Sequence, residues 1–593
     1  MEELQKQTNI NVQEKANLIW DIATHLYGQY KPHEYGRVIL PMTVIKRFDD
    51  SLKDTKAKVL EVAKRLDESG ATGMAREAIL KKTSGRDFYN VSRFDFEKLL
   101  ADSTNIAENF VDYLQGFSDN VKDIISYFEF DKEISKMSQN DLLFTIIQEF
   151  NSKKGDMSPN KVSSQDMGYI FEELVRKFSE SYDEHAGAHF TARDIINLMT
   201  ELLVGEDEER LEEEGITATI YDMAMGTSQM LGCMSDRLLE IDPDADITTY
   251  GQELNEQTFA IAKADTLIKG GNADNMRQGD TLGDDKFDGY KFDYIISNPP
   301  FGIEWKTSKA AVEAEHKKGA AGRFEPGLPA IGDGQQLFLL NGVAKLKDTG
   351  RMAIIQNGSP LFKGDAGGGE SNIRGYLLEN DWLEAIVQLP NDLFYNTGIA
   401  TYIWIITRNK LEERQGKVQL IDASQCYEKR RKPLGNKRVE ITETARKLIM
   451  QSYDSFSDGV LTGIAADGTE IRVESKVHEN DYFKYSKLFI MNPERDEAGN
   501  VKRDSKGKPI IDKSLNDTEI IPWLTERNEY LQKNVAPYSP DFIVDEKKTK
   551  IGYEIPFTRE FYKYTPLKPS ADIFEELKDL EQQEAEIMNK LLH

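Results

Sequence analysis

The chain has 593 residues, which at about 100–200 residues per domain predicts several domains and ample length for a large core. Hydrophobic residues make up 39% and charged residues 30%, which is typical of a globular chain rather than a disordered or fibrous one. Lysine and arginine number 75 against 102 aspartates and glutamates, so the formal net charge is −27. This balance excludes a chain that coats nucleic acid through bulk basicity, but it leaves room for a local basic groove or for a partner that supplies positive surface.

Cysteine content and hydropathy bear on the compartment. The two cysteines, Cys233 and Cys426, are too few for a disulfide framework or a cysteine zinc site, and they suit a reducing environment. The polar start lacks the apolar core of a signal peptide, and no apolar run approaches the ~20 residues of a membrane span. We therefore expect a soluble, cytoplasmic protein with no membrane partner.

Hydrophobic periodicity divides the chain into an N-terminal helical part and a longer mixed part. Residues 1–160 are expected to form an all-helical domain, because apolar residues recur at spacings of three and four, as in Leu18, Ile22 and Leu26. Between 161 and 455, helical stretches alternate with short β-rich runs, which predicts a mainly parallel α/β sheet whose last two strands suit a hairpin. These runs are 216–224, 246–252, 292–297, 351–356, 383–389 and 400–407. Ligands of such open sheets bind at the carboxyl ends of the strands.

The C-terminal part reads as an extension followed by one long helix. Residues 456–568 are turn-rich, with probable loop tips at Gly499-Asn500 and at 506–509. Residues 569–593 start with Pro569-Ser570 and carry a heptad seam that Glu584 interrupts. The apolar members of that seam are Ile573, Leu577, Leu580, Ile587 and Leu591. Such a helix either docks on its own core or binds a partner, and we take the partner-binding helix as the prediction.

The strongest chemical signal is the run 292–302, in which an apolar strand leads into Asn298-Pro299-Pro300-Phe301. Two prolines fix φ and remove backbone donors, so the turn presents oxygen acceptors, while Phe301 offers a ring face on which a base can stack. Two acceptors that hold the hydrogens of an adenine N6 amine favour a pyramidal nitrogen whose lone pair can attack an electrophilic methyl group. A rigid strand-to-loop turn without chemistry is the alternative.

A methyl donor site is expected on the neighbouring strands. Residues 216–220 lead into a strand-to-helix turn that contains Asp222, Gly226, Thr227, Ser228 and Gln229. The next strand ends at Glu253, whose carboxylate suits the ribose hydroxyls of S-adenosylmethionine, and Asp280 follows at a third strand end, in reach of the cofactor's adenine amine. Each acidic residue alone is also a common solvated cap, and their order ahead of Asn298 is what makes the set informative.

With these motifs, the sequence resembles the modification (methyltransferase, M) subunits of Type I restriction–modification systems. The segment Ala188-His189-Phe190-Thr191-Ala192-Arg193 looks like the family's first cofactor segment, and 222–231, 250–253 and 298–301 match its glycine turn, its acidic strand end and its catalytic turn. The resemblance implies a Rossmann-like S-adenosylmethionine-dependent methyltransferase sheet in 161–455, with an all-helical N-terminal domain and a C-terminal partner-binding helix. It also implies adenine-N6-specific DNA methylation within a complex that contains a second modification subunit, a specificity subunit and a restriction subunit on double-stranded DNA.

Two departures from the family pattern leave alternatives open. Met223 replaces the usual proline of the glycine turn, while Ser228 and Gln229 stand where glycines are common, at a place where φ > 0 and close approach to a ligand favour glycine. Ala192 also stands where the family usually has proline. A weakened or inactive scaffold subunit is therefore one alternative, and a protein glutamine methyltransferase, which uses a similar turn on a planar amide, is another.

Three further groups of histidines and basic residues could bind a metal ion or DNA. His185 and His189 lie four apart, but Gly187 interrupts them, so a loop is favoured and no metal site is predicted. Lys306, Lys317, Lys318 and Arg323 follow the catalytic turn and suit a loop that closes over an extruded nucleotide. The densest basic run suits DNA phosphates or, alternatively, a solvated loop. It comprises Lys429, Arg430, Arg431, Lys432, Lys437 and Arg438.

Overall fold

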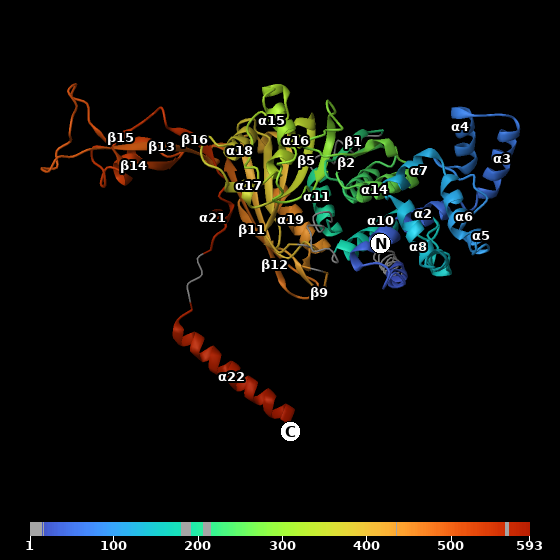
Figure 1. Cartoon of the computed structure of the whole chain (residues 1–593). Coiled ribbons are helices and arrows are strands. Elements are labelled where there is room, and N and C mark those ends of the chain that lie inside the picture. Colours follow the sequence, from blue (N-terminus) through green and yellow to red (C-terminus); the bar gives the residue numbers. More distant parts are fainter. Residues whose placement is uncertain are drawn as a thin grey trace. The chain divides into compact units, whose positions relative to one another are not determined.

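The computed structural model describes residues 15, 17–179, 191–205, 215–395, 397–434, 436–563 and 568–592 (Figure 1). The described residues form two units, 1–555 and 556–593. No helix in the described ranges combines the length and apolarity of a membrane span.

The N-terminal part is helical, as the periodicity predicts. Its helices are α2 (Gly36–Leu52), α3 (Lys56–Glu68), α4 (Gly73–Ser84), α5 (Phe96–Leu100), α6 (Ile106–Gln115), α7 (Asp119–Ser126), α8 (Phe130–Gln139) and α9 (Leu143–Phe150). The buried apolar side chains of α2 and α5–α9 form one core that extends into α10 (Ser164–Ser179) and into one side of α14 (Glu256–Lys269), whereas α3 and α4 share a smaller separate core. The other side of α14 contributes Phe259 and Ala262 to the core of the sheet. α14 is thus apolar on both sides because it is covered on both sides.

The central element is a ten-stranded sheet with the order β11-β12-β8-β6-β7-β5-β4-β1-β2-β3. Its strands are β1 (Thr217–Asp222), β2 (Asp246–Glu253), β3 (Met276–Gln278), β4 (Phe292–Ser297), β5 (Leu346–Asn357), β6 (Leu383–Gln388), β7 (Thr401–Thr407), β8 (Lys417–Gln425), β11 (Gly459–Ile464) and β12 (Glu470–Glu479). β1–β5 pair in parallel, whereas β7 runs antiparallel between β5 and β6, which confirms the hairpin expected from the last two runs.

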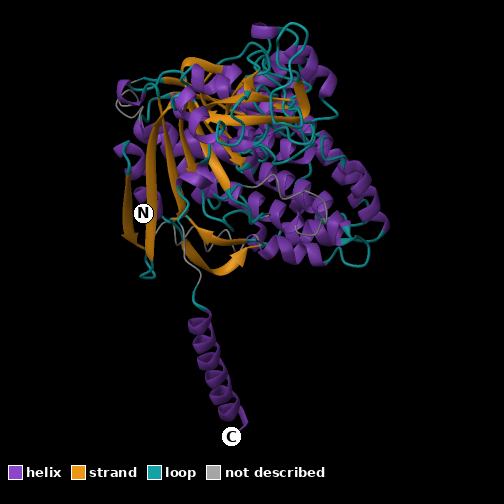
Figure 2. Ribbon diagram, turned by 90° about the vertical axis from the view of Figure 1, so that its left-hand side faces the viewer, coloured by secondary structure: helices purple, strands orange, loops and turns teal. Residues whose placement is uncertain are grey.

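Helices cover both faces of this sheet (Figure 2). Alternate strand residues, such as Ile220 and Tyr294, share a core with α11 (Arg193–Val204), α13 (Gln229–Ile241) and α19 (Glu443–Ser455). Met352, on the opposite face, lies against Gly342 of α16 (Gln335–Lys345). The short helices α15 (Lys309–His316), α17 (Ser359–Phe362) and α18 (Gly369–Glu379) complete the mixed region. The fold class is therefore the predicted α/β sheet with a helical N-terminal domain.

The sheet continues past residue 455, where we expected the α/β domain to end. β11 and β12 extend it through antiparallel pairing of β12 with β8. The turn-rich extension then forms its own four-stranded antiparallel sheet, from β13 (Lys484–Pro493), β14 (Ile511–Pro522), β15 (Ile543–Val544) and β16 (Lys550–Tyr553). α20 (Arg527–Asn534) packs on it through Leu531. The predicted tips are present, with Gly499 at φ +85° and Gly507 at φ +75°.

The second unit contains α21 (Phe557–Glu560) and the predicted C-terminal helix, α22 (Ser570–Leu592). The seam side chains of Ile573, Leu577, Leu580 and Ile587 are 45–60% exposed. The side chain of Leu591 lies outside the described residues.

Candidate active site

Three carboxylic side chains and one amide lie at or just after the ends of neighbouring parallel strands. Asp222 ends β1, Glu253 ends β2, Asp280 follows β3 and Asn298 follows β4. The strands lie side by side in the order β4-β1-β2-β3, and Asp222 pairs in register with Gly251. The carboxyl ends of parallel strands meet at one edge of a sheet, so the four residues that the sequence singled out belong to one edge.

Asp222 is 1% exposed and receives two hydrogen bonds through Oδ1. Ser297 Oγ donates at 2.7 Å and the Ala224 backbone N–H donates at 3.0 Å. Burial raises the pKa of Asp222 to about 7, and the nearby Glu253 carboxylate acts in the same direction, while the two hydrogen bonds oppose the shift. Asp222 thus fastens the ends of β1 and β4 together next to Asn298.

Glu253 holds the glycine turn. Its Oε2 accepts from the Gly226 N–H and its Oε1 from the Asn255 N–H, both at 2.8 Å. An ionised carboxylate offers about four lone-pair sites, so these two bonds leave acceptor capacity on each oxygen. Glu253 therefore fits the expected ribose partner, with its orientation set by the backbone of the turn.

The turn between β1 and α13 keeps a glycine-like backbone despite its sequence. Gly226 has φ +52° and Ser228 has φ +66°, so the serine adopts the left-handed conformation that the family's glycine would supply. That conformation costs an L-residue about 1–2 kcal/mol. The Met223 carbonyl accepts from Thr281 Oγ1 at 2.6 Å, and the Met225 N–H donates to the Gln252 carbonyl at 3.1 Å. The turn is therefore held in place by the loops beside it.

Gln229, the second unusual residue of the turn, packs against helix α10. A Cβ built on Gly168 would lie 2.5 Å from Gln229 Nε2, so the two residues are in close contact. Gln229 Oε1 accepts from Arg193 Nη2 at 3.4 Å, and the Arg193 guanidinium lies 3.6 Å from the centre of the Tyr169 ring. The bulky amide thus joins α10 and the start of α11 to the turn, which argues against the steric block that motivated the inactive-scaffold alternative.

The two ends of the Asn298 side-chain amide differ in their hydrogen bonding within the described residues. Its Nδ2 donates to Thr191 Oγ1 at 2.8 Å. Its Oδ1 is buried and has no hydrogen-bond donor among the described residues. Phe301 is half-buried and meets the Phe394 ring edge-on, with centroids 6.2 Å apart at 82°. A buried acceptor without a donor is costly, and a hydrogen-bond donor such as an amine N–H would satisfy it.

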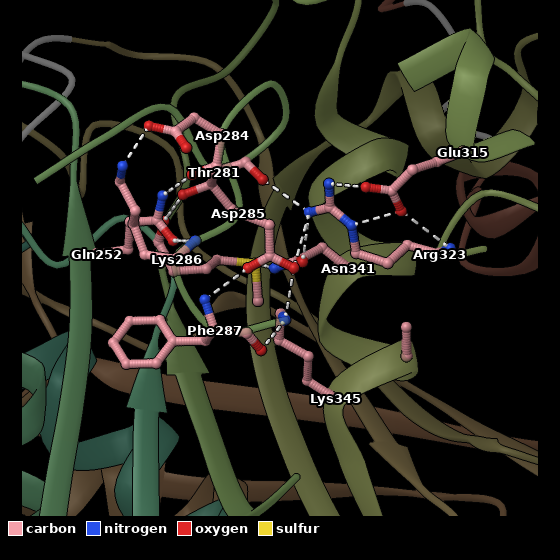
Figure 3. Close-up of polar contacts among 12 residues, drawn as sticks. Gln252, Thr281, Asp284, Asp285, Lys286, Phe287, Glu315, Arg323, Asn341 and Lys345 are labelled. Carbon is pink, nitrogen blue, oxygen red and sulfur yellow. Dashed lines mark hydrogen bonds and ion pairs between the residues drawn. The ribbon is translucent and has the colours of Figure 1, made fainter. Parts of the chain in front are cut away.

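Asp280 begins a loop that Arg323 holds from inside the protein, and Figure 3 shows Arg323 between Thr281, Glu315 and Asn341. The Asp280 carboxylate accepts from the Leu282 N–H and from Ser308 Oγ. Arg323 donates both to the Thr281 carbonyl, at 2.7 Å, and to the Leu282 carbonyl, at 3.2 Å. Its remaining donors face Glu315, at 2.6 and 2.9 Å, and Asn341 Oδ1, at 2.9 Å.

This network corrects our expectation for Arg323. Its side chain is 9% exposed, and Asp285 also lies near its guanidinium, at 3.7 Å. All of its donor directions are occupied by protein acceptors, so it is not a group that closes over a nucleotide. Lys306, Lys317 and Lys318 are exposed and remain candidates, although the segment contains α15 rather than an open glycine-rich loop.

The basic run forms a hairpin of β9 (Glu428–Leu434) and β10 (Lys437–Glu440), not the loop that we considered. Its exposed members are Lys429, Arg431, Lys432 and Arg438, while Arg430 pairs with Glu440. The expectation that Lys437 contacts DNA is wrong as well, because its side chain is 1% exposed. It donates to Asp194 Oδ2 at 2.8 Å and to the Leu393 carbonyl at 3.0 Å. A buried, paired lysine is unavailable to DNA phosphates.

The first cofactor segment is described in part. Ala188, His189 and Phe190, together with His185, lie outside the described residues. Thr191, Ala192 and Arg193 are described, with Ala192 as the N-cap of α11. Sequence reasoning missed Ser297 and Asp194, which position Asp222 and the start of α11. Serine next to Asn298 was the available signal for the first, and Asp194 gave none.

Two family models together match most of the chain. A family described as "N-6 DNA Methylase" matches residues 162–498, and one described as "HsdM N-terminal domain" matches residues 15–150. The chain belongs to the N-6 DNA methylase family, and within it to the methylase subunits of Type I restriction–modification systems. The S-adenosylmethionine-dependent DNA methyltransferase class expected from the sequence is confirmed at this level, which also disfavours a protein substrate.

Individual relatives show how far the similarity extends. The chain is 23% identical over 548 residues to the Type I restriction enzyme MjaIX methylase subunit of Methanocaldococcus jannaschii, covering 88% of this chain and 90% of that one. It is 27% identical over 368 residues to the HindI methylase subunit of Haemophilus influenzae, covering 60% and 73%. A solved Type I methyltransferase subunit from Streptococcus thermophilus shares the fold, with a TM-score of 0.59 and 21% identity over 80% of this chain and 97% of that one.

Proposed function

We propose that this chain methylates the N6 amine of adenine in double-stranded DNA with S-adenosylmethionine as the methyl donor, and that Asn298 and the Pro299 carbonyl hold the amine. The observation that carries the proposal is the buried Asn298 Oδ1, which no donor of the described residues reaches, at the same sheet edge as Asp222 and Glu253. S-adenosylmethionine, when bound, would supply an electrophilic methyl group.

The cofactor site is proposed to comprise the strand ends and the turn between them. Glu253 would hold the ribose hydroxyls, and Asp280 would lie near the adenine amine. The backbone of 226–229 would pass beneath the ligand, with Gly226, Thr227, Ser228 and Gln229 as its residues. Asp222 is included in the proposed cofactor site, and its Oδ1 also fixes the turn by accepting from Ser297 and Ala224. The segment 188–193 would contact the methionine end, with the Thr191 hydroxyl itself bonded to Asn298.

Asn298 acts on the amine through hydrogen bonding rather than through proton abstraction. An acceptor that holds an N–H of the amine reduces delocalisation of the nitrogen lone pair into the ring. The product proton can leave after transfer, so the neutral amide of asparagine suffices. Pro299 and Pro300 keep the turn stiff, and Phe301 offers a face for the extruded base.

An adenine inside a duplex cannot reach a pocket at a sheet edge, so the base must flip, at an unstacking cost of a few kcal/mol. The exposed cations of the β9–β10 hairpin are proposed to contact DNA phosphates. These are Lys429, Arg431, Lys432 and Arg438. With a net charge of −27, the isolated chain should bind DNA weakly. Recognition is therefore assigned to a separate specificity subunit, in a cytoplasmic complex with a second modification subunit and with restriction subunits.

The test uses the complex that this chain forms in its host, purified through a tag on the chain. Tritium from labelled S-adenosylmethionine should appear in DNA taken from cells that lack the gene, and calorimetry should detect binding of the cofactor. Transfer to protein instead of DNA would contradict the proposal. A complex that assembles on DNA but binds no cofactor would favour the inactive-scaffold alternative.

A further inference from the structure

The amide of Asn298 can work in only one orientation. Its Oδ1 must face the substrate amine, because an amide N–H directed at an amine N–H brings two donors together. The turn itself does not impose this choice, since proline lacks a backbone N–H and the amide rotates about χ2. Another group must therefore keep the Nδ2 end away from the substrate.

Thr191 is the residue that binds the Nδ2 end. Its Oγ1 accepts from Asn298 Nδ2 at 2.8 Å, across 107 residues of sequence. Asn298 Oδ1 is then left buried and without a donor among the described residues. We infer that Thr191 is a positioning residue that orients the Asn298 amide for attack on the methyl group. The inference rests on the proposed function and differs from the cofactor contact that family resemblance implies for this segment.

Thr191 is suited to the role because the start of α11 is fixed on two sides. Arg193 lies over Tyr169 and bonds to Gln229 of the glycine turn. Asp194 accepts from Lys437 Nζ at 2.8 Å and from the Ile441 N–H at 2.9 Å. These contacts hold the residues next to Thr191 from the turn and from β10. Gln229 departs from the family pattern, and Lys437 is buried although we expected it to contact DNA. Both residues hold the neighbours of Thr191 in place.

The helix behind Thr191 is also rigid. Residues along α11, among them Ile195, Met199 and Leu202, are fully buried in the core of the sheet. A hydroxyl next to a well-packed helix can hold an amide to within a fraction of an ångström. Positioning of a reacting group requires this precision. Misplacement of a reacting group by about 1 Å can cost about 100-fold in rate.

Three variants separate positioning from cofactor binding and from general packing. Thr191→Val is nearly isosteric and lacks the acceptor, whereas Thr191→Ser keeps it. Thr200→Val is the matched control, because Thr200 lies on α11, is 3% exposed and has a buried hydroxyl with no partner in the described part of the chain. All three are introduced into the full chain and purified as the host complex, with thermal unfolding measured alongside.

The readouts are kcat for methyl transfer, KM for DNA and the dissociation constant for S-adenosylmethionine. Thr191→Val should lower kcat by about 10–100-fold with the cofactor dissociation constant changed less than about twofold. Thr191→Ser should keep at least about half of the wild-type kcat, and Thr200→Val should match the wild type. An unchanged kcat for Thr191→Val, or a loss recovered at saturating cofactor, would overturn the inference and leave the proposed function intact. An inactive wild-type complex would refute both.

Discussion

Ser297, the last residue of β4, donates a 2.7 Å hydrogen bond to Asp222, the last residue of β1. This contact joins the strand that leads into the Asn298 turn to the strand that leads into the glycine turn. Because Asp222 is buried, its carboxyl holds a proton to a pKa of about 7. The relationship has a consequence for stability that can be measured without any ligand.

Asp222→Asn should flatten the pH dependence of stability. The unfolded chain releases this proton near pH 3.8 and the folded protein near pH 7. Between these values the folded state binds more protons, so the free energy of unfolding falls as pH rises and levels off above about pH 7. Removing the group should raise stability at pH 8, by up to a few kcal/mol, and leave it little changed at pH 4.

Denaturant unfolding of the wild type and the variant from pH 4 to pH 8 measures this effect. Ser297→Ala is the matched variant, because it removes a bond that favours the carboxylate and should extend the decline to higher pH. An Asp222→Asn curve parallel to that of the wild type would show that the carboxyl ionises normally.

Ser228→Gly should stabilise the protein relative to Ser228→Ala. The left-handed conformation at Ser228 costs an L-residue about 1–2 kcal/mol and costs glycine almost nothing. Glycine also increases the conformational entropy of the unfolded chain, which offsets part of this stabilisation. We therefore expect Ser228→Gly to be about 1 kcal/mol more stable than Ser228→Ala. Thermal or denaturant unfolding measures the difference. Equal stability of the two variants would contradict the strain at this turn.

Gly168 and Gln229 should be energetically coupled. Gly168→Ala gains helix propensity, about 1 kcal/mol, but its Cβ would meet the Gln229 amide that Arg193 holds. The substitution should therefore give little or no gain in the wild type and the full gain in a Gln229→Ala background. A double-mutant cycle on unfolding free energies should give a coupling of about 0.5–3 kcal/mol, and a value of zero would place the amide elsewhere.

Two parts of the basic hairpin should respond differently to substitution. Replacing Lys429, Arg431 and Lys432 together with glutamine should leave folding intact and reduce the slope of log affinity against log salt by about three. Lys437→Met should instead destabilise the protein by about 3–5 kcal/mol, because it leaves Asp194 without its buried partner.

Equilibrium binding of the host complex to a random-sequence duplex at several salt concentrations gives the slope. A triple variant with the wild-type slope would show that the hairpin does not contact DNA. A Lys437→Met protein of normal stability and reduced slope would reverse our correction.

Local patterns in the sequence predicted β1, β2, β4, β5, β6 and β7 and the polar residues at several strand ends, but not β8, β11 or β12. The run 292–297 coincides with β4, and Asp222, Glu253 and Asn298 meet at one edge because parallel strands end together. A strand that is buried on both faces appears in the sequence as a continuous apolar run, and the polar residue that follows the run marks the end of the strand.

Long-range pairing was beyond the sequence. Lys437 reaches Asp194 across 243 residues, and a lysine within a cationic run gives no sign that it is buried. Arg323 is similar, since two of its five acceptors are backbone carbonyls that any residue could supply, and the pairing of its other donors with Glu315 and Asn341 depends on the tertiary fold. The contact of Gln229 with Gly168 depends on how α10 packs, so the altered turn could be recognised as unusual but not explained.

The most direct test of the account is long-read mapping of N6-methyladenine in host DNA. Cells that carry the wild-type gene should show methylation at a defined sequence, and cells without the gene should show none there. Asn298→Ala should abolish the signal even though the protein accumulates, binds S-adenosylmethionine and assembles with its partners. Methylation at the wild-type level in the Asn298→Ala strain would contradict the assignment of the amine to this turn.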